Sequence, residues 1–323
     1  MFLDVSMPVM GGLEALEKAR ARGVDAAIIM TTAFGSGQVA IDTLRLGADD
    51  YLRKPFEPHE FNAVLLRAVR RLDLSRQNAF LQQQLDQKRI QLEAEIAKAA
   101  SVQSKLLPCE LPAIPGFEVA ARCIPAREVG GDLFDWQEAY RGTTAIALGD
   151  VSGKGMSAAL LMATVRATPR GVTPAHPPAT AIDIAEQALH DDFERSESFV
   201  TLFCAHVDPR KRQVSFVDAG HRYAFIRRAG GNVELLEPRG FPLGVMPEER
   251  YEQGAFTLAG GDALVTYSDG LVGASAYEDL TPEIMSEALE GAASAQEMVE
   301  RLVGLPRRDG DPPDDMTVLV LRG

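Results

Sequence analysis

The chain has 323 residues, of which 46% are hydrophobic and 24% charged, as is typical of a globular protein with room for more than one domain. Its formal net charge of −13 argues against nucleic-acid binding, which needs a basic surface, and no apolar run approaches the roughly 20 residues of a membrane span. Three cysteines without metal-site spacing predict reduced thiols and a cytoplasmic location.

The first seventy residues alternate predicted strands with predicted helices. Apolar strands are expected at residues 2–5, 26–30 and 48–53, and helices with Leu and Ala spacing at residues 13–22 and 38–46. This alternation predicts a parallel sheet, whose functional residues lie at the carboxyl ends of the strands.

Polar residues stand where each of these strands ends. Asp4 lies at the end of the first strand, Thr32 follows the second and Lys54 follows the third. With Met7-Pro8 and Lys54-Pro55, the segment resembles the receiver domain of two-component response regulators. The resemblance implies that Asp4 is the phosphoacceptor, Thr32 the switch hydroxyl and Lys54 the phosphate-pairing lysine. It also implies a cis peptide before Pro55 and an upstream histidine kinase as partner.

The resemblance covers only part of a receiver domain. The first strand, first helix and second strand have no counterpart, and neither has the acidic pair that binds Mg²⁺. We therefore expect a partial doubly wound domain over residues 1–72, with unpaired strand backbone, an exposed apolar face and poor phosphate acceptance by Asp4. A chain begun at an internal Met, or a fragment, is the expected origin, and a degenerate receiver is the alternative.

A long helix is predicted to follow, because residues 59–107 contain neither glycine nor proline. Apolar residues on a 4-3 spacing are Leu74, Leu81, Leu85, Leu92, Ala99, Val102 and Leu106, and the polar residues Asn78, Lys88 and Glu95 interrupt them. Residues 73–107 therefore predict an imperfect coiled coil that joins two copies as a homodimer and transmits signals. A single helix packed against its own domains is the alternative.

The remaining residues, 108–323, predict a mixed α and β domain. Strands are expected at residues 144–148, 199–207, 213–217, 223–228, 232–237, 263–267 and 317–321. Helices are expected at residues 156–168, 178–194 and 296–303, a hairpin turn at Gly230-Gly231, and a loop at residues 307–313.

Four aspartates stand where apolar, strand-like runs give way to small residues. They are Asp132 in VGGD, Asp150 in GDVSGKG, Asp269 in SDG and Asp314 in DDMT. Carboxylates that converge at one sheet edge repel one another unless a cation lies between them. A donor set of oxygens alone favours Mg²⁺ or Mn²⁺ over zinc, and two such ions can activate water against a phosphoryl group. GDVSGKG lacks the spacing of a phosphate-binding loop.

The motif order, from Gln103-Ser104-Lys105-Leu106-Leu107-Pro108 through Ala219-Gly220-His221 to DDMT, resembles the bacterial PPM-type serine/threonine phosphatases that regulate sporulation and stress sigma factors. The resemblance implies an α/β/β/α sandwich and a catalytic cluster that binds two Mn²⁺ or Mg²⁺ ions. Asp150 would bridge both ions and the Val151 carbonyl would join the second. Asp132 and Asp269 would bind one ion each, and Asp314 would complete the site.

The implied activity is hydrolysis of phosphoserine or phosphothreonine on a partner protein, an anti-sigma-factor antagonist. The alternative is an adaptor that binds a sigma factor or its regulator without catalysis. Three further residues near the motifs have open roles. His221 is a general acid or a turn residue, Arg122 or Arg127 would assist at the phosphoryl group, and Asp135 lies behind the metal ligands or at the surface.

Overall fold

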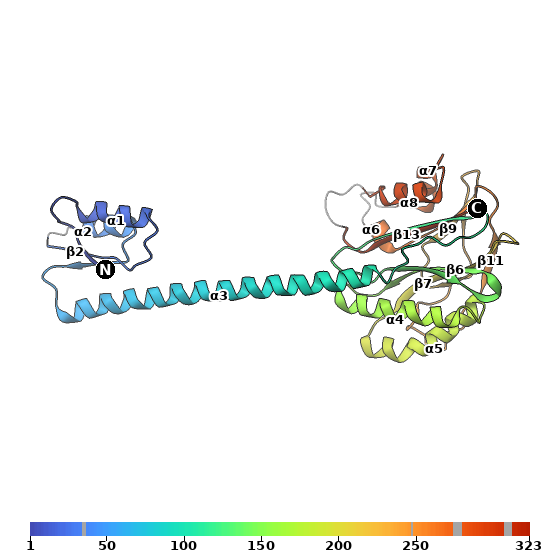
Figure 1. The fold of residues 1–323 in the computed structure, drawn as a ribbon, viewed down its shortest axis with the longest axis horizontal. Coiled ribbons are helices and arrows are strands. Elements are labelled where there is room, and N and C mark those ends of the chain that lie inside the picture. The colour runs from blue at the N-terminus through green and yellow to red at the C-terminus, as the bar shows by residue number, and fades with distance from the viewer. Residues whose placement is uncertain (34–36, 247, 274–279, 307–311) are drawn as a thin grey trace. The chain divides into compact units, whose positions relative to one another are not determined.

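A computed structural model of the chain describes residues 1–33, 37–246, 248–273, 280–306 and 312–323 (Figure 1). The chain divides into two compact units, residues 1–93 and residues 94–323. Most of the loop predicted at residues 307–313 lies outside the described residues. No described helix is long and apolar enough to cross a membrane.

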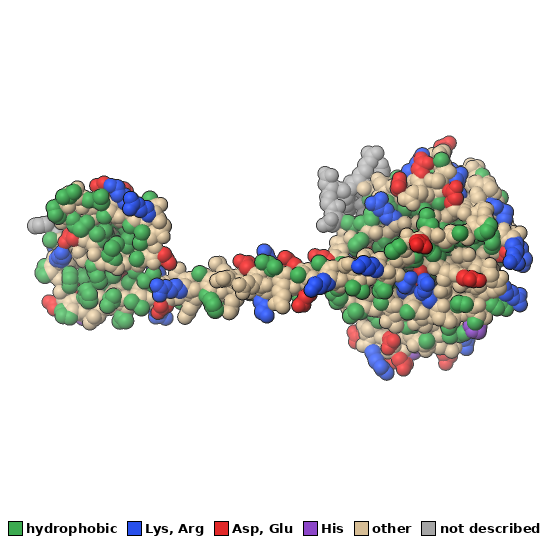
Figure 2. Space-filling model, viewed as in Figure 1, with side chains coloured by type: hydrophobic (Ala, Val, Ile, Leu, Met, Phe, Trp, Pro, Cys, Tyr) green, Lys and Arg blue, Asp and Glu red, His purple; other side chains and the backbone are tan. Residues whose placement is uncertain are grey.

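The N-terminal unit is built on a parallel sheet in the order β1-β2-β3. Its elements are β1 (Phe2–Asp4), α1 (Gly12–Ala21), β2 (Ile29–Thr32), α2 (Gly37–Arg45), β3 (Asp50–Arg53) and the start of α3 (Pro58–Ser104). In the described part of the chain, β1 pairs only with β2, so its other edge has no strand partner. Hydrophobic side chains are exposed on this unit, among them Met1, Phe2, Leu65, Leu66 and Val69 (Figure 2). The described part of this unit therefore leaves one strand edge and several apolar side chains uncovered.

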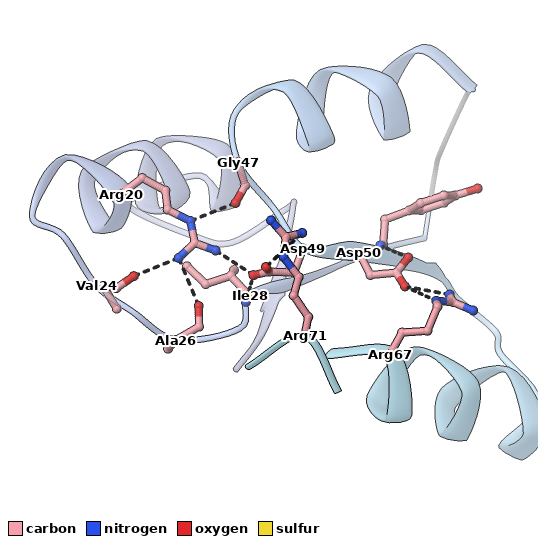
Figure 3. Close-up of polar contacts among 10 residues, drawn as sticks. Arg20, Val24, Ala26, Ile28, Gly47, Asp49, Asp50, Arg67 and Arg71 are labelled. Atoms are coloured by element: carbon pink, nitrogen blue, oxygen red, sulfur yellow. Dashed lines mark hydrogen bonds and ion pairs between the residues drawn. The ribbon is translucent and has the colours of Figure 1, made fainter. Parts of the chain in front are cut away.

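A network of hydrogen bonds and ion pairs centred on Arg20 links the elements of this unit (Figure 3). Arg20 of α1 binds the Asp49 carboxylate at 2.7 Å and donates to the backbone carbonyls of Val24, Ala26 and Gly47. Asp49 also accepts from the Ile28 backbone N–H at 2.7 Å and lies 3.4 Å from Arg71 of α3. Helix α1, strand β2, the entry to β3 and the early turns of α3 are thereby linked.

Helix α3 forms as the absence of glycine and proline predicts, and it ends within a few residues of the expected boundary. Only Val64 and Ala68 are fully buried on it. Four leucines of the 4-3 pattern, Leu74, Leu81, Leu85 and Leu92, are exposed in the single chain. These exposed leucines form a seam along α3 that can pack against another surface.

The C-terminal unit contains two five-stranded antiparallel sheets, in the orders β10-β9-β12-β13-β4 and β11-β8-β7-β6-β5. The strands are β4 (Glu118–Ile124), β5 (Leu133–Glu138), β6 (Thr144–Val151), β7 (Val200–Asp208), β8 (Gln213–Ala219), β9 (Ala224–Arg227), β10 (Val233–Leu235), β11 (Gly254–Thr257), β12 (Ala263–Tyr267) and β13 (Met316–Arg322). The helices are η1 (Tyr140–Gly142), α4 (Met156–Val172), α5 (Pro178–Ser196), α6 (Asp269–Gly273), α7 (Pro282–Ala288) and α8 (Ala295–Val303).

Three layers of hydrophobic core produce the sandwich. Along β13, Leu319 and Leu321 enter the core between the sheets, whereas Val318 and Val320 enter the core beneath α7 and α8. Helices α4 and α5 cover the outer face of the other sheet (Figure 1). Alternation of side chains along each strand buries both faces of both sheets. The predicted α/β/β/α architecture is confirmed.

Several elements differ from the sequence expectation. Strands β4, β5 and β11 and helices α6 and α7 were not predicted. Helix α4 was predicted to end at Thr168 but continues through Pro169 to Val172. Pro169 lies in the last helical turn, where only its own N–H bond is lost and the following residues still complete the helix.

Candidate metal centre

The four motif aspartates lie at the same end of the two sheets. Asp132 directly precedes β5 and Asp150 lies near the end of β6, where Leu133 pairs with Gly149. Asp269 begins α6 just after β12, and Asp314 comes just before β13, with Tyr267 paired to Val318. The pairing of β5 with β6 and of β12 with β13 therefore brings the aspartates together in two pairs.

Electrostatic coupling links these carboxylates. Burial, and then the neighbouring Asp150 carboxylate, raise the pKa of Asp132. Burial, and then Asp269 and Asp314, raise the pKa of Asp150 to about 7. The pKa of Asp269 is raised by burial and by Asp314. Asp132, Asp150 and Asp269 are therefore costly to ionise without a counter-cation.

The donor set fits a hard divalent cation. Both carboxylate oxygens of Asp132 are buried without a hydrogen-bond partner, and coordination to a metal ion would compensate their charge. The buried Val151 carbonyl faces Gly131, where an added Cβ would lie 2.7 Å from the oxygen. Within the described ranges, no three Asp, Glu, His or Cys side chains surround one point closely enough to hold an ion as they stand. The chemistry of the donors, rather than their spacing, is therefore what fits a hard divalent cation.

Asp315, which the sequence analysis did not select, anchors the loop that carries Asp132. Its carboxylate accepts from the backbone N–H groups of Ala126 at 2.8 Å and Gly131 at 2.6 Å. Gly270 permits the approach, because a Cβ there would lie 2.0 Å from the Asp315 carbonyl oxygen. The adjacent pair Asp314-Asp315 was the available signal, but the sequence did not show which residue points inward.

Lys154 of GDVSGKG holds the other aspartate of that pair. Its ammonium group lies 2.8 Å from the Asp314 carboxylate and donates to the Pro313 carbonyl at 3.0 Å. Arg127 is close by, since a Cβ on Gly155 would lie 3.9 Å from its Nη1. The second arginine considered, Arg122, is exposed on β4. Cations therefore gather on the Lys154 side of the site.

Gln103, at the end of α3, is a second residue whose role the sequence did not show. Its side-chain amide donates to the Gly130 carbonyl at 2.6 Å and accepts from the Gly130 N–H at 3.1 Å. Gly130 is two residues before Asp132, so the last turn of α3 is bonded directly to the loop that bears a candidate ligand. Only its place in the motif with Leu106-Leu107-Pro108 pointed to this residue.

His221 is a turn residue. It is buried, its Nδ1 lies 3.3 Å from the Thr201 hydroxyl, and its backbone N–H donates to Asp218 at 2.7 Å. Burial lowers the pKa of His221 to about 4, so the imidazole is neutral near pH 7 and lacks the proton of a general acid. Asp218 was not recognised in the sequence.

Asp135 lies inside the protein, so the surface role considered for it is wrong. It is buried and binds Arg166 at 3.2 Å and Arg170 at 2.6 Å, both on α4. This pairing fastens α4 to β5. Asp135 therefore supports the sheet from which Asp132 extends.

The receiver residues also lie together, at the ends of adjacent strands. The Asp4 carboxylate accepts from Lys54 and from the Ser6 N–H, and the Lys54 contact lowers the pKa of Asp4. The Lys54 N–H donates to the Thr32 carbonyl at 2.8 Å, and the Lys54-Pro55 peptide is cis. Thr32 itself is buried.

Comparison with known proteins gives matches to both units. Residues 140–323 match the family model for Stage II sporulation protein E (SpoIIE), and residues 1–66 match the response regulator receiver domain. The phosphoserine phosphatase RsbU of Bacillus subtilis is 29% identical over 240 residues, which cover 72% of this chain and 71% of RsbU.

Solved structures share the fold of the C-terminal unit. The RsbU and RsbW domains of Rv1364c from Mycobacterium tuberculosis align with a TM-score of 0.59 and 22% identity, over 67% of this chain and 62% of that one. The catalytic domain of the phosphatase PstP, in complex with two manganese ions, aligns with a TM-score of 0.50 and 18% identity, over 64% of this chain and 97% of that one.

Proposed function

The chain belongs to the SpoIIE family of PPM-type phosphatases, with a receiver segment before the phosphatase domain, and from this premise we propose that it is a metal-dependent protein serine/threonine phosphatase under two-component control. The observation that carries the proposal is the group of neighbouring carboxylates at one end of the sandwich, which includes the buried Asp132 without a hydrogen-bond partner. Such a group favours bound cations over an empty site.

Each residue has a distinct task in this proposal. Asp150 would bridge two Mn²⁺ or Mg²⁺ ions and the Val151 carbonyl would join the second, while Asp132 and Asp269 would bind one ion each and Asp314 would complete the site. When bound, the two cations activate water and neutralise charge on the phosphoryl group. The chain's other residues hold the ligands: Asp315 fixes the loop before Asp132, and Lys154 orients Asp314. The manganese ions of PstP support the choice of cation.

The proposed substrate is a phosphoserine or phosphothreonine of a regulatory protein, an anti-sigma-factor antagonist. The similarity to RsbU, a phosphoserine phosphatase, supports this class. The proposed input is an upstream histidine kinase that acts on Asp4, which already contacts Lys54 at the strand ends.

We further propose that α3 joins two copies into a homodimer through its exposed leucine seam. Leu74, Leu81 and Leu85 are exposed in the single chain, and pairing with a second copy would bury them. Sedimentation equilibrium of the full chain tests this proposal, and a monomer at all concentrations would contradict it.

The phosphatase is tested by hydrolysis of p-nitrophenyl phosphate with Mn²⁺, with EDTA, and with the variants Asp150→Asn and Asp269→Asn. EDTA should abolish activity. Each substitution should lower kcat by about 100-fold or more, because the loss of a carboxylate ligand weakens binding of the cations that stabilise the transition-state charge. Asp191→Asn, on the exposed face of α5, is the matched control and should retain activity.

Two results would change the interpretation. Hydrolysis that persists in EDTA and in both site variants would contradict a metal-dependent reaction at this centre. A folded protein that binds Mn²⁺ but hydrolyses nothing, and whose Asp150→Asn variant still binds a partner protein, would favour the adaptor.

A further inference from the structure

A cavity of about 470 Å³ opens directly beside the candidate metal centre. Asp150 and Asp269 line it together with Arg222, Tyr223 and Pro242. Burial and then the charges of Asp269 and Asp150 raise the pKa of Tyr223, so its hydroxyl remains a neutral hydrogen-bonding group in this wall. The cavity therefore adjoins the carboxylates but extends beyond them.

Arg222 holds a backbone conformation that its side chain does not favour. Its φ is +62°, in the left-handed region where glycine and asparagine are preferred. The turn is fixed by Asp218, whose two carboxylate oxygens accept from the Arg222 N–H at 3.1 Å each. Gly220 packs against Pro242, where a Cβ would meet the ring at 2.5 Å. The contacts of Asp218 and Pro242 thus fix the turn, and neither contact requires an arginine side chain there.

Arg212 offers a comparison, because it too has a positive φ, of +52°. Its guanidinium donates to the Leu258 carbonyl at 2.8 Å and lies 4.8 Å from the Phe117 ring centroid, so its side chain serves the fold. The Arg222 side chain is exposed and makes no hydrogen bond or ion pair with any described residue. A disfavoured backbone conformation whose side chain makes no compensating contact within the fold is typical of functional sites.

We propose that Arg222 is a specificity-determining residue that binds an acidic side chain adjacent to the phosphorylated residue of the protein substrate. This inference rests on the proposed phosphatase function and names the kind of sequence that the site selects. Guanidinium matches a carboxylate with two parallel hydrogen bonds. The phosphoryl group itself belongs at the carboxylates and their cations, where Lys154 and Arg127 already lie.

The charge of the surroundings makes Arg222 decisive for whether an acidic segment can bind. The chain carries a net charge of −13, and Asp150 and Asp269 line the same cavity as Arg222. An acidic substrate segment would be repelled by this site unless a free cation met it. In the described wall of the cavity, Arg222 is the cation placed to do so.

The test compares two phosphoserine peptides of the same sequence, one with Glu and one with Gln on both sides of the phosphoserine. The wild-type protein with Mn²⁺ should favour the Glu peptide by about fivefold in kcat/KM, as expected for an exposed charge pair. Arg222→Gly suits the positive φ and keeps the fold, and should reduce this ratio to about one. Arg222→Glu should reverse the preference.

The outcomes separate this inference from the function on which it rests. Wild-type protein without Mn²⁺-dependent hydrolysis of p-nitrophenyl phosphate would overturn both. An active wild type with no preference for the Glu peptide, or with a preference that Arg222→Gly retains, would overturn the role of Arg222 alone. Matching melting temperatures of the variants and the wild type would show that a changed ratio reflects recognition.

Discussion

The bond between the end of α3 and the metal-site loop gives a quantitative prediction for Gln103→Ala. The wild-type side chain makes two hydrogen bonds to the Gly130 backbone, at 2.6 and 3.1 Å, and the pair is only partly buried. Each bond of this kind contributes about 1 kcal/mol, so their loss should lower the free energy of unfolding of the C-terminal unit by about 2 kcal/mol.

Metal affinity should change as well, because Gly130 is two residues from Asp132. Loss of a residue that orients a metal ligand commonly weakens metal binding by about 10- to 100-fold. Urea unfolding of metal-free protein measures the first effect, and isothermal titration with Mn²⁺ measures the second. Gln103→Glu should act in the same direction, because it places a carboxylate against the Gly130 carbonyl.

Gln91→Ala is the matched control, because Gln91 is exposed on the same helix. It should unfold and bind Mn²⁺ like the wild type. If Gln103→Ala also behaved like the wild type in both measurements, the two hydrogen bonds would contribute nothing and α3 would not position the site. Reduced stability with unchanged Mn²⁺ affinity would restrict Gln103 to a structural role.

Two further predictions concern a buried histidine and a crowded glycine. Burial lowers the pKa of His206 to about 4, whereas the unfolded value is about 6.5, so the unfolded chain takes up the proton first as the pH falls. His206 should therefore contribute a decrease of up to about 3 kcal/mol in the free energy of unfolding between pH 6.5 and 4. His206→Gln should reduce the pH dependence of the free energy of unfolding, measured by urea titration at each pH. An unchanged dependence would contradict the lowered pKa of His206. Gly270→Ala places a Cβ 2.0 Å from the Asp315 carbonyl oxygen and should cost at least about 1–3 kcal/mol and weaken Mn²⁺ binding. Gly171→Ala, with no atom within 4 Å of its Cβ, should not destabilise, and equal effects of the two would refute the crowding argument.

The architecture was predictable where strands are rich in branched apolar residues. Strand β12 (Ala263–Tyr267) was predicted with its observed bounds, and β13 to within a residue at each end. Strand β4 was missed because its alternation is carried by alanines and interrupted by Arg122. Strand β5 was missed because Asp135 and Gln137 resemble loop residues until Arg166 and Arg170 of α4 neutralise the aspartate. Those partners are distant in sequence.

The site was less predictable than the fold, because its supports depend on tertiary contacts. The motifs indicated the four aspartates, but Asp315 bonds residues more than 180 positions away, and Gln103 bonds a glycine 27 positions away. Adjacent aspartates look equivalent in a sequence, and only the folded chain separates the buried Asp315 from the more exposed Asp314. The left-handed conformation of Arg222 also has no sequence signal, since the turn is set by Asp218 and Pro242.

Strand β13 has a consequence for how the sheet finds its alignment. Its two faces are both apolar, so a shift by one residue would still bury a hydrophobic side chain on each side, and hydrophobicity alone specifies the register weakly. Polar contacts at one end break this ambiguity: the Ser268 hydroxyl donates to the Asp315 carbonyl and accepts from the Thr317 N–H, at 3.1 and 2.8 Å. The residues that border the candidate metal centre therefore also fix the register of β13, and we expect substitutions at Ser268 to weaken this register as well as to disturb the site.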